Sequence, residues 1–272
     1  MTDRRRIPAR KTVAAAHLKG QVEAERFAEG VPMEVGMSLL DLRVKPDPTT
    51  PLDTQLLAGE GFTVYDELPD MGLSWGQSER DGYVGYVFTQ GLVEKSPEPP
   101  RMITALAAIV YMKPDAKSDL MGAYSFGCGV HVTGEAAGDF LQLNTGAYIP
   151  EPYLAPVGTD DFVSVAERFI GVPYMWGGRS SYGLDCSALV QLSLMAVGTE
   201  APRDSDMQMA ELGGAVDGPL RRGDLLFWDG HVGIMRDAET ILHANAHHMA
   251  VASEPLAEME KRVGERLAVR RL

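Results

Sequence analysis

The pattern of apolar residues changes once along the chain, near Pro156, and this change divides the fold. Before it, short apolar runs at 39–44, 61–68, 73–79 and 82–89 are rich in Val, Tyr, Phe, Trp and Thr and are bounded by turn residues, which is typical of strands. After it, residues 160–171 and 185–198 carry apolar side chains at helical spacing, each ending on a glycine. Strands at 223–230, 231–238, 239–246 and 248–255 follow. We therefore expect β-rich modules followed by an α+β domain.

The β-rich part divides into two stretches, 31–97 and 101–154, at the proline-containing joint EKSPEPPR. The stretches echo each other: DGYVGYV at 81–87 is matched by TGAYIP at 145–150, and GEGFTVYDE at 59–67 by FGCGVHVTGE at 126–135. We interpret them as two copies of one small all-β barrel, the second degenerate. Residues 1–30 contain an amphipathic stretch interrupted at Gly20, which we expect to form a helical strap. The last domain is then 157–272.

Composition excludes several classes of function. The chain has 272 residues, 45% of them apolar, which is enough for a large core, and a net charge of −13. An acidic surface repels phosphate backbones and anionic lipid, so we expect no nucleic-acid or membrane partner. No apolar run reaches the roughly 18 residues of a membrane span. The first thirty residues lack the apolar core of a secretory signal, so a complete chain is expected in the cytoplasm, with its two cysteines as thiols.

Cys186 is the candidate nucleophile. It lies where a glycine-rich stretch enters an apolar helix, and unpaired N–H groups and the dipole at a helix start favour the thiolate. His231 and His243 lie on two successive predicted strands, so a hairpin would bring them side by side as a base and its orienting partner. Each residue could instead be structural. Cys128, among small and apolar residues, is interpreted as structural.

A metal site is the alternative for the histidines. His243, His247 and His248 have a spacing that suits one helical face. The segment reads instead as a turn entering a strand, and no carboxylate or second cysteine is suitably placed. We therefore expect no metal, and nothing in the sequence implies a cofactor.

These residues closely resemble the NlpC/P60 family of cysteine peptidases, which have a papain-like fold. The family's motifs occur in order over about 110 residues: YMWGG (174–178), DCS (185–187), RGDLLF (222–227), HVGI (231–234) and HA (243–244). PRDSDMQ (202–208) and the paired β modules resemble the subgroup with tandem bacterial SH3-like (SH3b) domains. That subgroup cleaves γ-D-glutamyl-L-diamino acid bonds in peptidoglycan-derived peptides that carry a free N-terminal L-Ala.

The resemblance implies a role for each matching residue. Cys186 is the nucleophile, His231 the general base and His243 the orienting residue, while Tyr174 and the amide of Cys186 stabilise the oxyanion. The remaining matches are implied to bind substrate: Asp185, Ser187, Ser205 and Trp176, together with Tyr86 from the first SH3b module.

Asp185 has a further expected role. An unpaired carboxylate beside the nucleophile raises the pKa of the thiol, and a bound substrate ammonium would neutralise it. This would select peptides with an unblocked amino terminus. The expected partners are stem peptides of the type L-Ala-γ-D-Glu-diamino acid, and a monomer is favoured.

Two other functions compete with a cytoplasmic recycling peptidase. One is a wall hydrolase acting on intact peptidoglycan, which requires export. The other is a non-catalytic SH3b protein that binds wall peptides. The first SH3b module is expected to act as a specificity wall of the cleft, the alternative being a packing or targeting module.

Overall fold

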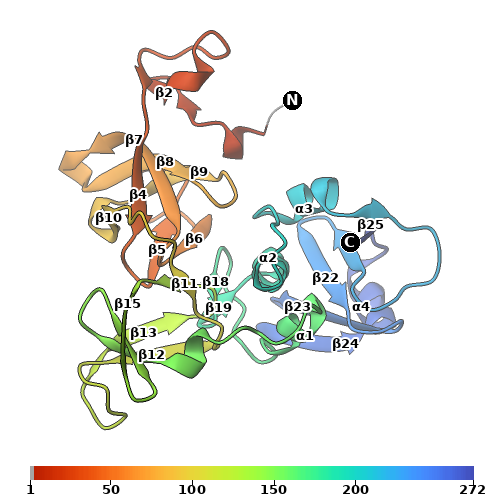
Figure 1. Ribbon diagram of the computed structural model, residues 1–272. Helices are drawn as coiled ribbons and strands as arrows, with labels where there is room; N and C mark the ends of the chain where they lie inside the picture. The colour runs from red at the N-terminus through yellow and green to blue at the C-terminus, as the bar shows by residue number, and fades with distance from the viewer. Residues whose placement is uncertain (1–2) are drawn as a thin grey trace. The chain divides into compact units, whose positions relative to one another are not determined.

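The computed structural model describes residues 3–272, which divide into two compact units (Figure 1). Unit 1 ends at Leu154 and unit 2 begins at Ala155. Within the described residues, no helix is both long and apolar enough to cross a membrane. Each unit is described by itself below.

The N-terminal segment is a small sheet, so the predicted helical strap is wrong. It contains the 3-10 turns η1 (Arg4–Arg6) and η2 (Ala16–Leu18) and the sheet β1 (Ala9–Arg10), β2 (Val13–Ala15) and β3 (Phe27–Ala28). All three residues of β2 are fully buried, and Val13 packs against Trp75 and Val84 of the next module. Burial of this strand against another module outweighs the helical periodicity of the local sequence.

Module 1 covers residues 31–94 and is built from two sheets. An antiparallel sheet has the order β10-β4-β7-β8-β9, and β5 pairs with β6 in a separate ribbon. A bridge between Arg43 and Tyr86 links the ribbon to β9. The bounds are β4 (Val31–Val35), β5 (Leu39–Leu42), β6 (Thr54–Leu57), β7 (Gly61–Leu68), η3 (Pro69–Met71), β8 (Leu73–Ser78), β9 (Val84–Phe88), η4 (Thr89–Gly91) and β10 (Leu92–Glu94).

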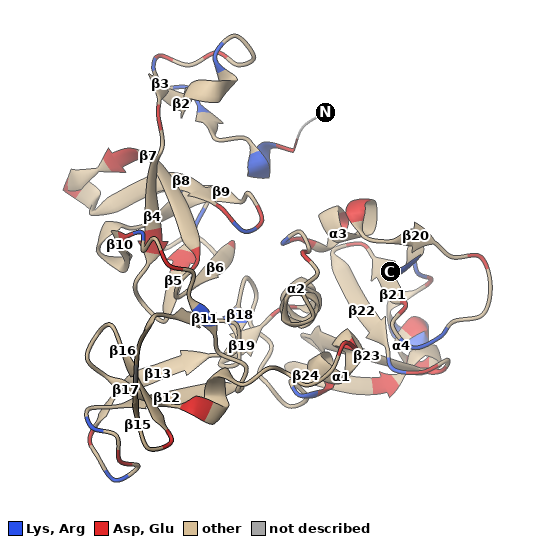
Figure 2. Ribbon diagram, viewed as in Figure 1, with Lys and Arg blue, Asp and Glu red and all other residues tan. Residues whose placement is uncertain are grey.

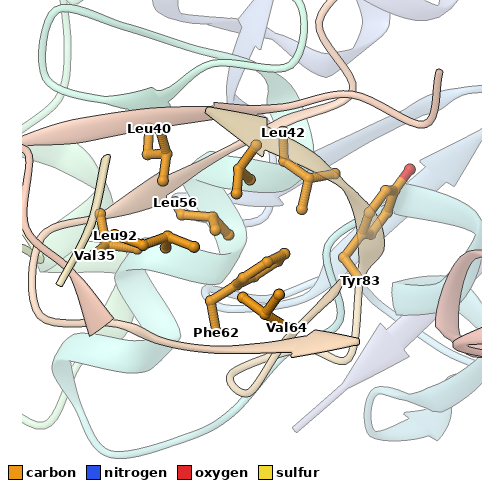
Figure 3. Packing of buried hydrophobic residues seen from close by; sticks show 9 residues of the cluster. Val35, Leu40, Leu42, Leu56, Phe62, Val64, Tyr83 and Leu92 are labelled. Atoms are coloured by element: carbon orange, nitrogen blue, oxygen red, sulfur yellow. The ribbon is translucent and has the colours of Figure 1, made fainter. Parts of the chain in front are cut away.

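The core of module 1 lies between these two sheets. Phe62 and Val64 of β7 face Leu40 and Leu42 of β5, and all four are buried (Figure 3). These positions alternate along their strands, as the period-two pattern of the sequence predicts. The cluster is completed by Val35, Leu56, Tyr83, Val87 and Leu92.

Module 2 covers residues 101–150 and repeats the strand pairings of module 1. Its bounds are β11 (Arg101–Met102), β12 (Ala107–Tyr111), β13 (Leu120–Ser125), β14 (Gly129–Val130), β15 (Val132–Ala137), β16 (Phe140–Leu143) and β17 (Tyr148–Pro150), followed by η5 (Glu151–Leu154). β12 pairs with β13 as β5 pairs with β6, and β11 pairs with β14 as β4 pairs with β7. The antiparallel run β15-β16-β17 corresponds to the run β7-β8-β9. Likewise, β12 pairs with β17, and a bridge after β5 links it to β9.

The two modules are joined by close backbone contact. The N–H of Gly129 donates to the carbonyl of Ala58 over 2.7 Å, and a Cβ on Gly59, whose φ is +76°, would lie 2.9 Å from the Gly129 backbone. The buried thiol of Cys128 donates to the carbonyl of Ser38 across the same junction. Cys128 is thus a packing residue within unit 1.

Unit 2 has the α+β composition expected from the sequence. Its helices are α1 (Phe162–Glu167), α2 (Cys186–Ala196), α3 (Ser205–Glu211) and α4 (Leu256–Val263). A six-stranded antiparallel sheet has the order β20-β25-β21-β22-β23-β24, and a small hairpin joins β18 to β19. The strands are β18 (Arg179–Ser180), β19 (Gly183–Leu184), β20 (Gly214–Ala215), β21 (Leu225–Trp228), β22 (His231–Met235), β23 (Thr240–Asn245), β24 (Ala250–Pro255) and β25 (Ala268–Arg271).

Helix α2 is the centre of unit 2. It contacts α1 and α3 as well as β22 and β23, and residues 186–194 are all buried. A helix that is covered on every side is fixed in position by its neighbours rather than by one apolar stripe. Its first residue, Cys186, therefore has a fixed place in unit 2.

Candidate active site

Cys186 is the first residue of α2, where the sequence placed it. Asp185 caps the helix: its backbone is extended, and its side chain accepts from the N–H of Ala188 over 2.9 Å. The main-chain N–H of Val232, the residue after His231, lowers the pKa of the thiol. The sulfur therefore lies near the start of β22.

The carboxylate of Asp185 already has partners, so the prediction that it is unpaired is wrong. Arg203, which is 1% exposed, donates to both carboxylate oxygens over 2.9 and 2.6 Å. Ser187 Oγ donates over 3.0 Å, and the N–H of Gly177 over 3.0 Å. With the cap to Ala188, the two oxygens accept five hydrogen bonds. Asp185 is thus a buried anion paired with a buried cation.

The two predicted histidines meet and lead to a third group. His231 Nε2 lies 2.8 Å from His243 Nδ1, and His243 Nε2 lies 2.9 Å from Glu254 Oε1. Arg262 donates to both oxygens of Glu254, over 2.6 and 3.1 Å. The strands β22, β23 and β24 and the helix α4 thus supply a chain of four side chains that ends on a cation.

This chain sets the position of each proton. The ionised Glu254 can only accept, so His243 carries its proton on Nε2 and accepts with Nδ1. His231 must then donate from Nε2, which leaves its Nδ1 with a lone pair. In this tautomer His231 is able to accept a proton, as a general base must.

Burial keeps both imidazoles neutral. It lowers the pKa of His231 to about 4, with a smaller contribution from the neighbouring His243. It also lowers the pKa of His243 to about 4, against the hydrogen bond and charge of Glu254, which raise it. Arg262 and His243 in turn hold the pKa of Glu254 below its usual value, although burial raises it. Near neutral pH, the charges of this chain are therefore those of Glu254 and Arg262.

Cys186 rests as a thiol, contrary to the thiolate expected from its place at a helix start. Burial raises the pKa of Cys186 to about 12, the charge of Asp185 raises it further, and the N–H groups of Val232 and Ser187 and the charge of Arg203 lower it only in part. Desolvation outweighs the helix dipole, which is worth at most ~2 kcal/mol. Any reaction of this sulfur as a nucleophile therefore requires that its proton is removed in the same step.

Tyr174 lies within the electrostatic reach of the thiol. Burial raises its pKa to about 12, and the charges of Cys186 and Asp185 add to this effect. Its phenol therefore stays protonated at neutral pH and remains a hydrogen-bond donor.

The other predicted substrate residues lie in different surroundings. Ser187 is buried and donates a hydrogen bond to Asp185. Ser205 is the first residue of α3. The side chains of Arg203 and Gln208 in the same segment form hydrogen bonds with residues at the start of α2. The nearby Trp176 is 66% exposed. Tyr86 belongs to unit 1.

The N-terminal segment holds Tyr86 in place. Its hydroxyl accepts a hydrogen bond from Arg10, whose guanidinium also lies over the rings of Tyr86 and Trp75 and pairs with Asp66.

Sequence reasoning missed Glu254, Arg262 and Arg203. A signal for Glu254 existed in the strand register: Ala252 pairs with His243, and Glu254 lies two residues further along on the same face of β24. Arg203 lies inside the PRDSDMQ motif, but the family resemblance implied a role for only one residue of that motif, Ser205. Arg262 could not be found, because its contact depends on the packing of α4.

A set of possible metal ligands overlaps this chain. His243, His248 and Glu254 have ligand atoms within 4.8 Å of one another. Each of those atoms already has a protein partner, since His248 Nδ1 lies 3.0 Å from Asn245 Oδ1 and Glu254 binds His243 and Arg262. The geometry of these residues is that of a hydrogen-bonded network.

Known families match two parts of the chain. Residues 171–265 match the NlpC/P60 family, and residues 42–92 match the bacterial dipeptidyl-peptidase Sh3 domain. The C-terminal domain belongs to the NlpC/P60 family. The NlpC/P60 membership and the bacterial SH3 domain predicted from the motifs are thus confirmed.

Named relatives extend the likeness beyond one domain. The chain is 30% identical over 206 residues to a gamma-D-glutamyl-L-lysine dipeptidyl-peptidase of Bacillus cereus, a match covering 65% of this chain and 60% of that protein. A protein of the same name from Bacillus subtilis is 33% identical over 93 residues, 31% of each chain. The matches thus span 60% of the length of the first relative and 31% of that of the second, which is less than two thirds of either.

The fold has a counterpart among solved structures. An NlpC/P60 family protein from Bacillus cereus is similar with a TM-score of 0.75 and 22% identity, over 88% of this chain and 99% of that one. This similarity supports the NlpC/P60 fold. The strands of module 1 form a five-stranded sheet and a two-stranded ribbon, which the bridge between Arg43 and Tyr86 links.

Proposed function

We propose that this protein is a cysteine peptidase that hydrolyses the bond between γ-D-glutamate and an L-diamino acid in peptidoglycan-derived peptides. The observation that carries the proposal is the chain from His231 through His243 to Glu254, beside a thiol at a helix start. Support for the substrate class comes from the two relatives named gamma-D-glutamyl-L-lysine dipeptidyl-peptidases.

The reaction follows from the resting protonation states. Cys186 Sγ attacks the γ-carbonyl carbon of D-Glu as its proton moves to Nδ1 of His231. The N–H of Cys186 and the phenol of Tyr174 stabilise the oxyanion. His231 then protonates the amine of the diamino acid, which leaves as the C–N bond breaks. Water, deprotonated by His231, hydrolyses the thioester and releases the γ-glutamyl product and the thiol.

We further propose that the substrate carries a free N-terminal L-Ala. The carboxylate of Asp185 is shared with Arg203, so a substrate ammonium bound there must exchange with one of the existing hydrogen bonds. Ser187, Ser205 and the exposed Trp176 are the remaining candidates for contacts with the terminal dipeptide, with Tyr86 of module 1 as a further candidate.

We propose that module 2 is a second SH3b domain, so that the chain has tandem modules. The support is that its strand pairings repeat those of module 1, whose residues 42–92 match the Sh3 family. A cytoplasmic role in recycling remains a prediction of the sequence, which cell fractionation tests. The prediction that the protein is a monomer is tested by measuring its molar mass in solution by light scattering.

The deciding experiment compares four substrates by mass spectrometry of the products. L-Ala-γ-D-Glu-L-Lys and its diaminopimelate counterpart should each be cut after D-Glu, and their N-acetylated forms should be poor substrates. Cys186→Ala should abolish cleavage of all four. Equal cleavage of acetylated and unblocked peptides would refute the requirement for an ammonium. Release of peptides from intact sacculi at a comparable rate would favour the wall hydrolase instead.

A further inference from the structure

Two histidines and one glutamate meet at the far end of the chain that starts at His231. A ring nitrogen of His243, a ring nitrogen of His248 and a carboxylate oxygen of Glu254 all lie within 4.8 Å of one another. In the sequence, no carboxylate lies beside these histidines. Glu254 reaches them from β24, and His248 lies in the turn between β23 and β24. This His-His-Glu cluster has the donor set of two imidazoles and one carboxylate that zinc uses.

The distances between the donor atoms of the His-His-Glu cluster suit a tetrahedral ion. His243 Nε2 lies 2.9 Å from Glu254 Oε1, and His248 Nδ1 lies 3.9 Å from the same oxygen. Zinc bonds to nitrogen and oxygen are about 2.0–2.2 Å long, which places tetrahedral ligands roughly 3.3 Å apart. The two observed distances lie on either side of this value. Small movements of the side chains would therefore bring all three atoms into coordination.

His248 gives the cluster access to solvent. Its side chain is 35% exposed, whereas the side chains of Glu254 and His243 are 10% and 1% exposed. Asn245 fixes the turn, because its Oδ1 accepts from the main-chain N–H of His248 over 2.8 Å and lies 3.0 Å from His248 Nδ1. The ring is thus held with Nδ1 near Glu254. An ion could enter from the exposed side and keep a water molecule as its fourth ligand.

We propose that the His-His-Glu cluster binds a zinc ion, and that this ion blocks the nitrogen with which His231 accepts a proton. The binding stands on the cluster alone, whereas the inhibition rests on the proposed function. His248 ligates through Nδ1, and its proton moves to Nε2, which the exposed ring presents to water. Asn245 keeps the hydrogen bond from the main-chain N–H of His248, so the turn stays in place.

The inhibition follows from the tautomers of the two catalytic rings. At rest, His243 carries its proton on Nε2 and accepts from His231 at Nδ1. Zinc takes the lone pair of Nε2, so a neutral His243 must carry its proton on Nδ1. The proton between the rings moves from His231 Nε2 to His243 Nδ1, and the proton displaced from His243 Nε2 passes through water to His231 Nδ1. The two rings keep two protons, but His231 then has no lone pair for the thiol proton.

Arg262 competes with the ion for Glu254. It donates to both carboxylate oxygens, over 2.6 and 3.1 Å, and its side chain is 30% exposed. It lies on α4, a helix that carries both acidic and basic residues (Figure 2). A cation beside the cluster opposes zinc binding, and Arg262 has to release one oxygen when the ion enters. The cluster should therefore bind zinc reversibly, unlike a closed structural site with four protein ligands.

The first experiment measures zinc binding without the catalytic thiol. The untagged full chain, as the Cys186→Ala variant, is titrated with zinc chloride in a calorimeter and should bind one ion. In this background, His248→Ala should weaken zinc binding at least roughly tenfold, and Arg262→Gln should tighten it because the competing cation is gone. His247→Ala is the matched control, since His247 is the adjacent exposed histidine outside the cluster, and it should bind zinc as the parent does.

The second experiment measures inhibition of the enzyme that retains Cys186. Hydrolysis of L-Ala-γ-D-Glu-L-Lys is followed at buffered zinc concentrations, and each rate is divided by the zinc-free rate of the same variant. Zinc should inhibit the parent and His247→Ala alike, a chelator should restore both, and His248→Ala should need roughly tenfold more zinc.

The two experiments fail in different ways. Equal inhibition of the parent and His248→Ala would place the ion on Cys186 and His231 instead and overturn the proposal. No zinc binding by Cys186→Ala, or an equal loss of binding in His247→Ala, would also overturn it. Full activity of the zinc-bound enzyme would overturn the inhibition. A peptide that is not cleaved even without zinc would refute the proposed function, and the calorimetry would then decide the zinc site by itself.

Discussion

Glu254 is predicted to act on catalysis through two imidazoles. Its hydrogen bond to His243 Nε2 fixes the tautomer of that ring, which fixes the tautomer of His231. In Glu254→Ala, His243 can adopt the opposite tautomer, and His231 would then present an N–H to the thiol instead of a lone pair. A hydrogen bond to a charged group is worth about 1.5–3 kcal/mol. The loss in kcat/KM should therefore be roughly 10- to 150-fold.

The pH profile separates this positioning role from a structural one. Glu254 raises the pKa of His243 against the effect of burial, which lowers it to about 4. Removing the carboxylate should therefore move the acidic limb of kcat/KM to lower pH while the plateau falls. Glu254→Gln keeps an oxygen acceptor without the charge, so it should restore part of the rate.

The control for this prediction lies on the neighbouring helix. Glu258 is on α4, its side chain is 60% exposed, and it pairs with Lys261. Glu258→Ala should leave both the rate and the limb unchanged, and thermal melts correct each rate for the folded fraction. A Glu254→Ala enzyme with more than half the parent rate, or with an acidic limb that moves to higher pH, would refute the tautomer argument.

Three further predictions concern charge. Arg203→Met leaves the buried Asp185 without its cation and should lower the free energy of unfolding by about 3–5 kcal/mol in denaturant titrations; a loss below about 1 kcal/mol would contradict this pairing. The native imidazoles of His231 and His243 resist protonation until about pH 4, whereas the unfolded chain takes up these protons near pH 6.5. The free energy of unfolding should therefore fall as the pH drops from about 6.5 to about 4. This pH dependence should be weaker in His231→Asn. With an unblocked peptide, kcat/KM should decline above about pH 8 as the substrate amine deprotonates, and a decline of the same size with an amine-free analogue would assign it elsewhere.

The sequence predicted correctly those features of the fold that depend on residues close to one another in the chain. Asp185 caps the helix because its side chain reaches the N–H three residues later, and that spacing is visible in the sequence. The strands of His231 and His243 were also predictable, because each is a short apolar run between turn residues. The N-terminal prediction failed, since the burial of Val13 depends on Trp75, about sixty residues away.

The sequence by itself determined that Cys186 begins a helix, that the two imidazoles lie on successive strands, and the order of the elements around them, because motif spacing and helix capping act over a few residues. Only the tertiary structure decided the charge and protonation states of the site. The pairing of Asp185 with Arg203, the attachment of His243 to Glu254, and the burial that keeps Cys186 a thiol all join segments distant in the chain. Charge stabilisation and desolvation depend on what surrounds a group in space, and folding alone brings those surroundings together.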